Sequence, residues 1–161
     1  MKAVQTFGFM AALALSACSQ HPGAAALSTH GSGLVHPESG LRVIPLTVSH
    51  GTTRHTFRVE VAGTEFEQAK GLMFRKAMGA DEGMIFPMAP PHDASFWMHN
   101  TVIPLDIIYI GTDHRILNIA ANAVPYSDQP LASAGVASGV LELNGGRAAE
   151  LGIGPGDVVA W

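Results

Sequence analysis

The segment LDIIYI, residues 105–110, is the feature that most restricts what this chain can fold into. After its aspartate, β-branched and aromatic residues follow without interruption, which predicts a strand buried on both faces. Gly-Thr-Asp-His at 111–114 has the composition of a tight turn, and RILNIAA, residues 115–121, follows as a second strand. The sequence therefore predicts an antiparallel β-hairpin, and with it a fold built around a sheet.

Further short segments with strand character lie on either side of this hairpin, separated by glycine and proline. HTFRVEVA alternates apolar and polar residues, which is typical of a half-buried strand. Pro87 is expected to end the strand GMIFPM, and loops are expected at residues 89–93 and 122–137. The expected strands are HTFRVEVA (55–62), GMIFPM (83–88), ASFWMHN (94–100), SGVLELN (138–144) and DVVAW (157–161).

Two short helices are predicted between these strands. TEFEQAKGLMFRK, residues 64–76, has apolar residues at helical spacing, and Thr64 with Glu67 has the pattern of a capping box. Gly71 within this segment indicates a close approach of another part of the chain. In the second helix, GGRAAEL, Asn144 is the expected N-cap and Gly152 the expected left-handed C-terminal residue.

Together these elements predict an α+β fold that is mostly β. We expect a small antiparallel barrel or a highly curved sheet with two short helices, and the strand order stays open. The chain has 161 residues, which is enough for one such domain, expected at residues 54–161. A formal net charge of −4 gives no reason to expect nucleic acid binding.

The N-terminal residues have the features of an export signal. An apolar run follows Lys2, and Leu-Ser-Ala-Cys at residues 15–18 resembles a bacterial lipobox. This resemblance implies that residues 1–17 are a lipoprotein signal peptide and that Cys18, the only cysteine, is lipidated. Residues 18–53, rich in small and polar residues and with Pro45 interrupting a strand-like piece, are expected to form a flexible tether.

Several motifs of the expected domain occur together in a specific order. They are FRVEVA, EQAKGLMFR, EGMIFPM, FWMHNTVIPLDIIYI, VLELNGG and LGIGPGD. From Phe57 to Trp161 the chain closely resembles the bacterial and archaeal family known as domain of unknown function 192. The resemblance implies a compact mixed fold dominated by a small barrel, and it implies no reaction. The family pattern usually carries lysine where this chain has His99.

Five polar or aromatic residues are the candidate site, because apolar packing alone does not account for them. An unpaired charge within apolar segments is costly, so Arg75 is expected either in a buried ion pair with one of two carboxylates or in an open polar cleft beside an exposed aromatic ring. The candidate cleft residues are Arg75, Trp97, Asn100, Asp106 and Glu142.

Two catalytic or metal-binding alternatives stay open. A hydrolase could use Asp106, Glu142 or a histidine, although the chain has no G-x-S-x-G motif and a glycosidase pair needs carboxylates about 5–9 Å apart. Copper could use thioether and imidazole groups in residues 88–99, namely Met88, His92, Met98 and His99. Met98 and His99 are neighbours on the expected strand, however, and would point to opposite faces of the sheet. We therefore expect no metal, and we expect no cofactor.

The sequence thus predicts a lipoprotein anchored to the membrane through Cys18, facing the periplasm or lying on the outer-membrane side. Its expected role is a binding or accessory module for a polar small molecule, an envelope polymer or another envelope protein. The alternative is an envelope hydrolase. Catalysis by a cysteine nucleophile is excluded, because Cys18 belongs to the expected anchor.

Overall fold

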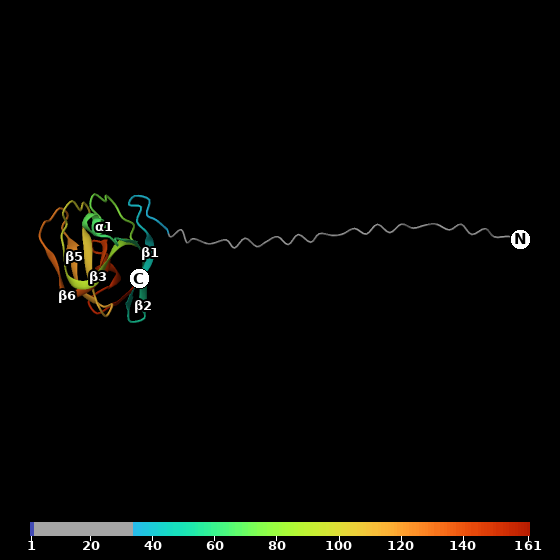
Figure 1. The fold of residues 1–161 in the computed structure, drawn as a ribbon. Coiled ribbons are helices and arrows are strands. Elements are labelled where there is room, and N and C mark those ends of the chain that lie inside the picture. Colours follow the sequence, from blue (N-terminus) through green and yellow to red (C-terminus); the bar gives the residue numbers. More distant parts are fainter. Residues whose placement is uncertain (2–33) are drawn as a thin grey trace. The chain divides into compact units, whose positions relative to one another are not determined.

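The computed structural model describes Met1 and residues 34–161 of the chain (Figure 1). The expected signal peptide and the expected lipidation at Cys18 concern residues 2–33, which lie outside the described part. Within residues 34–161, seven strands form one curled half-barrel sheet with two short helices, which confirms the predicted fold class. The elements are β1 (Val43–His50), β2 (Thr53–Val61), α1 (Glu65–Lys70), β3 (Glu82–Phe96), β4 (Leu105–Gly111), β5 (Ile116–Ala123), β6 (Leu131–Asn144), α2 (Arg147–Leu151) and β7 (Val158–Ala160).

The sheet has the strand order β5-β4-β6-β3-β2-β1-β7. Neighbouring strands are antiparallel except β2 and β3, which are parallel and are joined through α1. The predicted hairpin is present as β4 and β5, and every residue of β4 is buried. A single bridge between Arg115 and Val158 brings the two edges of the curled sheet together.

The two faces of the sheet carry separate apolar clusters. The inner core receives buried residues from all seven strands and from α2, so it fills the concave side. The outer core lies mainly against β3, β4 and β6, and Leu72 and Met98 from segments outside the sheet cover it. α1, labelled in Figure 1, is followed, after Gly71, by Leu72 of this outer core. Because both faces are covered, residues that alternate outward along a strand can still be buried.

β1 runs through Pro45, although a break was expected there. Proline cannot donate to a sheet ladder and is tolerated where one side of a strand has no partner. β7 pairs with β1 only from Thr47 to Ser49, so Pro45 is paired on one side alone, with Arg58 of β2. Residues 43–50, which were expected to be part of the tether, therefore belong to the sheet. For the residues before Val43, the tether stays a prediction.

β3 also continues where a loop was expected at residues 89–93, and it ends at Phe96, before the predicted end of the strand at Asn100. The pairing of β3 with β6 shifts register between Pro87 and His92, which spares the intervening prolines from a ladder bond. β2 pairs only with the first residues of β3, so the rest of β3 has no neighbour on that side. Its partner β6 likewise begins at Leu131, inside the loop expected at 122–137.

Both predicted helices are present. α1 is shorter than expected, and α2 has a different N-cap from the one expected. α1 has the predicted capping box but ends at Gly71, whose φ of 47° interrupts the helix. A Cβ at Gly71 would lie 3.3 Å from Phe86, which confirms the expected close approach. Asn144 does not cap α2. The N-cap is Gly146, without a side-chain cap, and the predicted left-handed Gly152 is confirmed at the C-terminal end.

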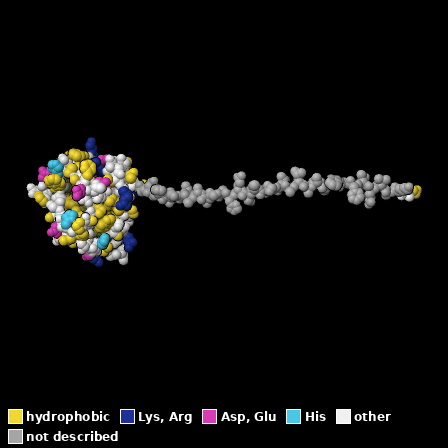
Figure 2. Space-filling view, in the orientation of Figure 1, with side chains coloured by type: hydrophobic (Ala, Val, Ile, Leu, Met, Phe, Trp, Pro, Cys, Tyr) yellow, Lys and Arg dark blue, Asp and Glu magenta, His cyan; other side chains and the backbone are white. Residues whose placement is uncertain are grey.

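In the part of the chain that the structure describes, no helix has the length and apolar character needed to cross a membrane. Figure 2 shows apolar, acidic and basic side chains mixed over the visible face of residues 34–161.

Candidate functional site

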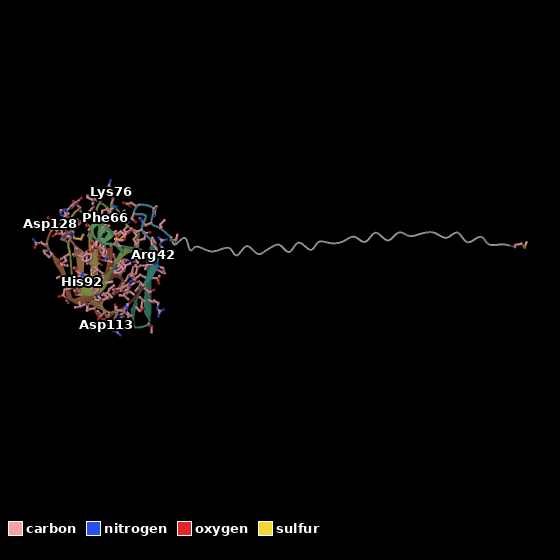
Figure 3. The ribbon with its side chains drawn as sticks, in the orientation of Figure 1. Arg42, Phe66, Lys76, His92, Asp113 and Asp128 are labelled. Atoms are coloured by element: carbon pink, nitrogen blue, oxygen red, sulfur yellow. The ribbon has the colours of Figure 1, made fainter. Side chains whose placement is uncertain are left out.

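A cleft with a volume of about 420 Å³ opens on the outer face of the sheet. The end of α1, the middle of β3 and the segment after β3 form its walls. Figure 3 labels His92 on this part of β3 and Phe66 on α1. The residues that line the cleft are Gln68, Ala69, Lys70, Gly71, Leu72, Met73, Phe86, Met88, His92, Ala94, Ser95, Phe96, Trp97, Thr101 and Glu142.

Glu142 is the buried acid of this cleft. It lies on β6, where it pairs with Met84 of β3 and Ile107 of β4, both members of the outer core. Residues paired across strands share a face of the sheet, so the Glu142 side chain points into the apolar outer core. Its relative exposure is 5%, yet it lines the cleft. Glu142 therefore lies at the boundary between the apolar outer core and the open cleft.

Burial raises the pKa of the Glu142 carboxyl to about 8, and no charge or hydrogen bond of the described residues offsets this effect. An apolar environment favours the neutral acid. Tyr109 of β4 lies on the same face, and burial, followed by the charge of Glu142, raises the pKa of its phenol. The Tyr109 hydroxyl donates to the Leu131 carbonyl at 2.6 Å and not to Glu142.

Trp97 stands at the rim of the cleft with 54% of its surface exposed. Its ring stacks beside His99, with 5.2 Å between the ring centres. The backbone around it is held in place because Met98 donates its N–H to the Ser127 carbonyl at 2.9 Å. An exposed indole on a fixed backbone is suited to packing against a ligand.

Arg75 does not enter this cleft. Its two terminal nitrogens bind the two carboxylate oxygens of Glu60 on β2 at 2.8 and 3.1 Å, and its Nε contacts Glu38 at 3.1 Å. The expected partners, Asp106 and Glu142, are thus wrong, while the expected buried ion pair is present. Glu60 pairs with Met84 in the sheet, so it lies on the outer face, where Arg75 covers it.

The environment of Arg75 is that of a satisfied structural pair. Burial acts to lower the pKa of the guanidinium, but the hydrogen bonds and charge of Glu60 outweigh it, so the pKa is raised. Ser39 also donates to Glu60, and the His36 ring lies 3.6 Å from it. A smaller cleft of about 210 Å³ lies beside Arg75, and Lys70 lines both clefts.

Asp106 lies on the opposite face of the sheet from Glu142. It pairs with Leu143 of the inner core, one residue along β6 from Glu142. Its two oxygens accept the N–H groups of Asn122, Gly146 and Ala148 at 2.8–2.9 Å. Asp106 is therefore used to hold the start of α2, and the two carboxylates cannot form one catalytic pair because the sheet separates them.

Asn100 contributes its backbone to the site. It has φ of 53°, and its carbonyl accepts the N–H of Phe74, which has φ of 65°. Asparagine tolerates this left-handed conformation better than most residues, which accounts for its presence here. Of the five candidate residues, the structure brings only Trp97 and Glu142 into one cleft.

The residues weighed for copper do not converge. Met88 and His92 line the cleft, whereas Met98 is fully buried in the outer core and His99 contacts Asp128 at 2.7 Å. Among the described residues, no three His, Cys, Asp or Glu side chains are grouped as metal ligands would be.

Sequence reasoning missed Glu60 and several polar residues of the cleft. Glu60 alternates with Phe57 and Val59 and so was expected to face solvent, because the pattern of β2 alone does not reveal that its second face is covered. Gln68 and Lys70 lie in the predicted helical segment, residues 64–76, and were not assigned to a site. The apolar segment GLMFR, residues 71–75, was expected to continue the helix. It could have indicated that a segment outside the sheet covers the second face, because Leu72 packs in the outer core.

Comparison with known proteins agrees with this architecture. A crystal structure of a protein of unknown function from Novosphingobium aromaticivorans DSM 12444 is 59% identical, covers 82% of this chain and 94% of its own, and has a TM-score of 0.79. A second, from Sinorhizobium meliloti 1021, is described as a "putative transcription regulator". It is 34% identical, covers 74% of this chain and 94% of its own, and has a TM-score of 0.72. A search of curated proteins finds no significant match.

The family model DUF192, described as Uncharacterized ACR, matches residues 46–161. This range extends from within β1 to the last residue and contains both cores and the cleft. The chain therefore belongs to the DUF192 family.

Proposed function

We propose that this protein is an envelope binding module that holds a small polar ligand in the cleft between α1 and β3. The observation that carries the proposal is Glu142, a buried acid without a partner on the floor of an open cleft. Native structures rarely bury an acid without a hydrogen-bond partner, and such groups are concentrated at functional sites. A bound ligand that contacts Glu142 accounts for its position.

The composition of the cleft walls supports a ligand with both polar and apolar parts. Phe86, Met88 and Phe96 contribute apolar surface, and Trp97 adds an exposed ring at the rim. The volume of about 420 Å³ lies within the range of small-molecule sites. We extend the proposal to a polymer end or to the terminus of another envelope protein.

The alternative of a hydrolase keeps one supporting observation. A carboxyl with a pKa of about 8 is able to exchange protons near neutral pH, as a general acid or base must. The expected second carboxylate, Asp106, is bound by backbone N–H groups on the other face. The other carboxylate of the outer face, Glu60, is held by Arg75, so Glu142 has no free carboxylate beside it with which to form a glycosidase pair. Binding is therefore the better supported function.

We further propose that residues 1–17 are a signal peptide and that lipid attached to Cys18 anchors the domain to the membrane. The lipobox-like sequence before Cys18 supports this proposal. The wild type should incorporate radiolabelled fatty acid, and Cys18→Ala should not. Equal labelling of the two proteins would contradict the anchor and would leave the proposal for the cleft intact.

A thermal-shift screen of the full chain against polar small molecules tests the binding function. We expect at least one compound to raise the Tm of the wild type, and we expect the shift to be lost in Trp97→Ala. Phe66→Ala is the matched control, because Phe66 is an exposed aromatic residue that lines the smaller cleft instead. Shifts that persist in Trp97→Ala, or no shift with any compound, would contradict the proposal.

A further inference from the structure

We infer that the cleft selects a ligand that carries a primary ammonium group on an aromatic or otherwise apolar body, and that this group binds ionised Glu142. The inference rests on the proposed binding function and names the class of its ligand. It follows from counting which hydrogen-bonding atoms in the cleft are still free. Three polar side chains that line the cleft have used their donors on the protein and retain acceptors, whereas Lys70, Ser95 and Trp97, which are exposed, keep their donors.

Gln68 is the first of these side chains. Its amide nitrogen donates to the Ala62 carbonyl at 3.2 Å and to the Pro87 carbonyl at 2.9 Å. An amide NH₂ group has two donors, so both are used. What Gln68 still offers to the cleft is its carbonyl oxygen, which is an acceptor.

His92 and Thr101 follow the same pattern. The Nδ1 of His92 lies 2.9 Å from the Pro90 carbonyl, which can only accept, so Nδ1 carries the proton and Nε2 of the neutral ring is an acceptor. The Thr101 hydroxyl donates to the His99 carbonyl at 3.4 Å, and its oxygen keeps free lone pairs. With Glu142, four side chains that line the cleft therefore offer acceptors.

A primary ammonium group is the complement of such a set, because it presents three donors on one atom together with a positive charge. An apolar body attached to it would contact Phe96 and Met88, and the Trp97 ring offers its face to a cation or to an aromatic group. A neutral hydroxyl offers one donor and no charge. The cleft is therefore expected to distinguish an amine from an alcohol of the same shape.

The charged and titratable groups around Glu142 determine how binding depends on pH. Tyr109 faces it from β4, His92 lines the cleft from β3, and Lys70 lines it from the end of α1. On β2, Glu60 lies on the same face and is neutralised by Arg75. Lys70 is the one cation among the described residues that line the cleft, and it opposes a bound cation.

Binding of an ammonium ion to ionised Glu142 must release the proton that this acid carries below pH 8. For an amine that stays protonated over this range, such as benzylamine, affinity should thus rise by up to about tenfold for each pH unit between about pH 6 and 8. At about pH 7 the binding of each molecule of such an amine should release about one proton. His92 and Lys70 also line the cleft, so a variant that lacks only the acid is needed to assign the effect.

The experiment is calorimetric titration of the full chain with two matched pairs of probes, benzylamine with benzyl alcohol and phenylalaninamide with its N-acetylated form. We expect both amines to bind and both neutral partners to bind at least about tenfold more weakly. Glu142→Gln should lower amine affinity about 10- to 100-fold and remove most of its pH dependence. Glu150→Gln, an exposed carboxylate on α2 outside the cleft, should match the wild type.

The results separate this inference from the proposed function. If the neutral probes bind as tightly as the amines, or if Glu142→Gln binds amines like the wild type, the inference is overturned while binding in the cleft stands. If the amines do not bind while another compound from the thermal-shift screen requires Trp97, the inference is also overturned. If nothing binds in a manner that depends on Trp97, both proposals fail.

Discussion

Asp106 and Glu142 are both buried carboxylates, and they lie almost side by side in the β4–β6 ladder. Asp106 pairs with Leu143 and Glu142 pairs with Ile107, so the two acids point to opposite faces of one sheet. On the inner face, Asp106 accepts three backbone N–H groups. On the outer face, no hydrogen bond or charge of the described residues offsets the burial of Glu142, and its pKa is raised to about 8.

This difference shows that burial alone does not reveal the role of an acid. The inner face is closed by α2, whose first N–H groups need an acceptor, and Asp106 supplies it. The outer face is closed only in part, and Glu142 lies where the cleft reaches the apolar cluster. The first acid stabilises the fold, whereas the second costs stability when it ionises and is retained, in our account, for binding.

The largest effect is expected when the acid of the inner face is removed. Asp106→Ala leaves three backbone N–H groups without an acceptor and should lower the free energy of unfolding by about 5 kcal/mol. Urea unfolding at neutral pH measures the change. Asp113→Ala, which removes an acceptor in an exposed turn, is the control and should cost under about 1 kcal/mol. Equal losses of stability in the two variants would contradict the conclusion that Asp106 stabilises the fold.

A smaller loss is expected from breaking the paired acid of the outer face. Arg75→Met leaves Glu60 buried without its bidentate partner and should cost about 3–5 kcal/mol. Adding Glu60→Gln to this variant should recover part of the loss, because the unpaired charge is then gone. Stability of Arg75→Met close to that of the wild type would mean that Arg75 serves a ligand and not the fold.

The third prediction concerns pH. Glu142 keeps its proton up to about pH 8 when folded, while in the unfolded chain it ionises near 4.5. Its contribution to stability is present below about pH 4.5 and falls by up to about 1.4 kcal/mol per pH unit as pH rises to 8. The stability of Glu142→Gln relative to the wild type should therefore increase over this range in urea unfolding. A constant difference, as expected for Glu150→Gln, would contradict the raised pKa.

The smallest effect on stability is expected at the rim. Trp97 is more than half exposed, and replacing it with alanine should change the free energy of unfolding by no more than about 0.5 kcal/mol. Thermal unfolding measures this directly. A large loss of stability in Trp97→Ala would show that the ring holds the outer core together and would weaken its assignment to a ligand.

The parts of the fold that could be predicted are those set by neighbouring residues. The β4–β5 hairpin follows from an apolar run and a turn, and the capping box of α1 follows from Thr64 and Glu67. Each depends on contacts within a few positions of the chain. The prolines of β1 and β3 misled the prediction because their cost depends on which strand edges lack a partner, which is a property of the whole sheet.

The candidate site was predicted in part for the same reason. Burial of Arg75, Asp106 and Glu142 could be expected from their apolar neighbours, and all three are buried. The partners of these residues could not be predicted. Alternation along a strand shows which residues share a face, but it does not show which strands are neighbours in the sheet. The parallel pairing of β2 with β3 places Glu60 beneath Arg75, and no local pattern reveals that pairing.

A ¹³C NMR titration of the Glu142 side-chain carboxyl, assigned by comparison with Glu142→Gln, measures directly whether this acid is buried, unpaired and open to a ligand. We expect a midpoint of about pH 8 for the free protein, and a midpoint displaced to lower pH when benzylamine is bound. A midpoint near 4.5 in the free protein, unchanged by the amine, would contradict the claim that this acid is buried, unpaired and open to a ligand.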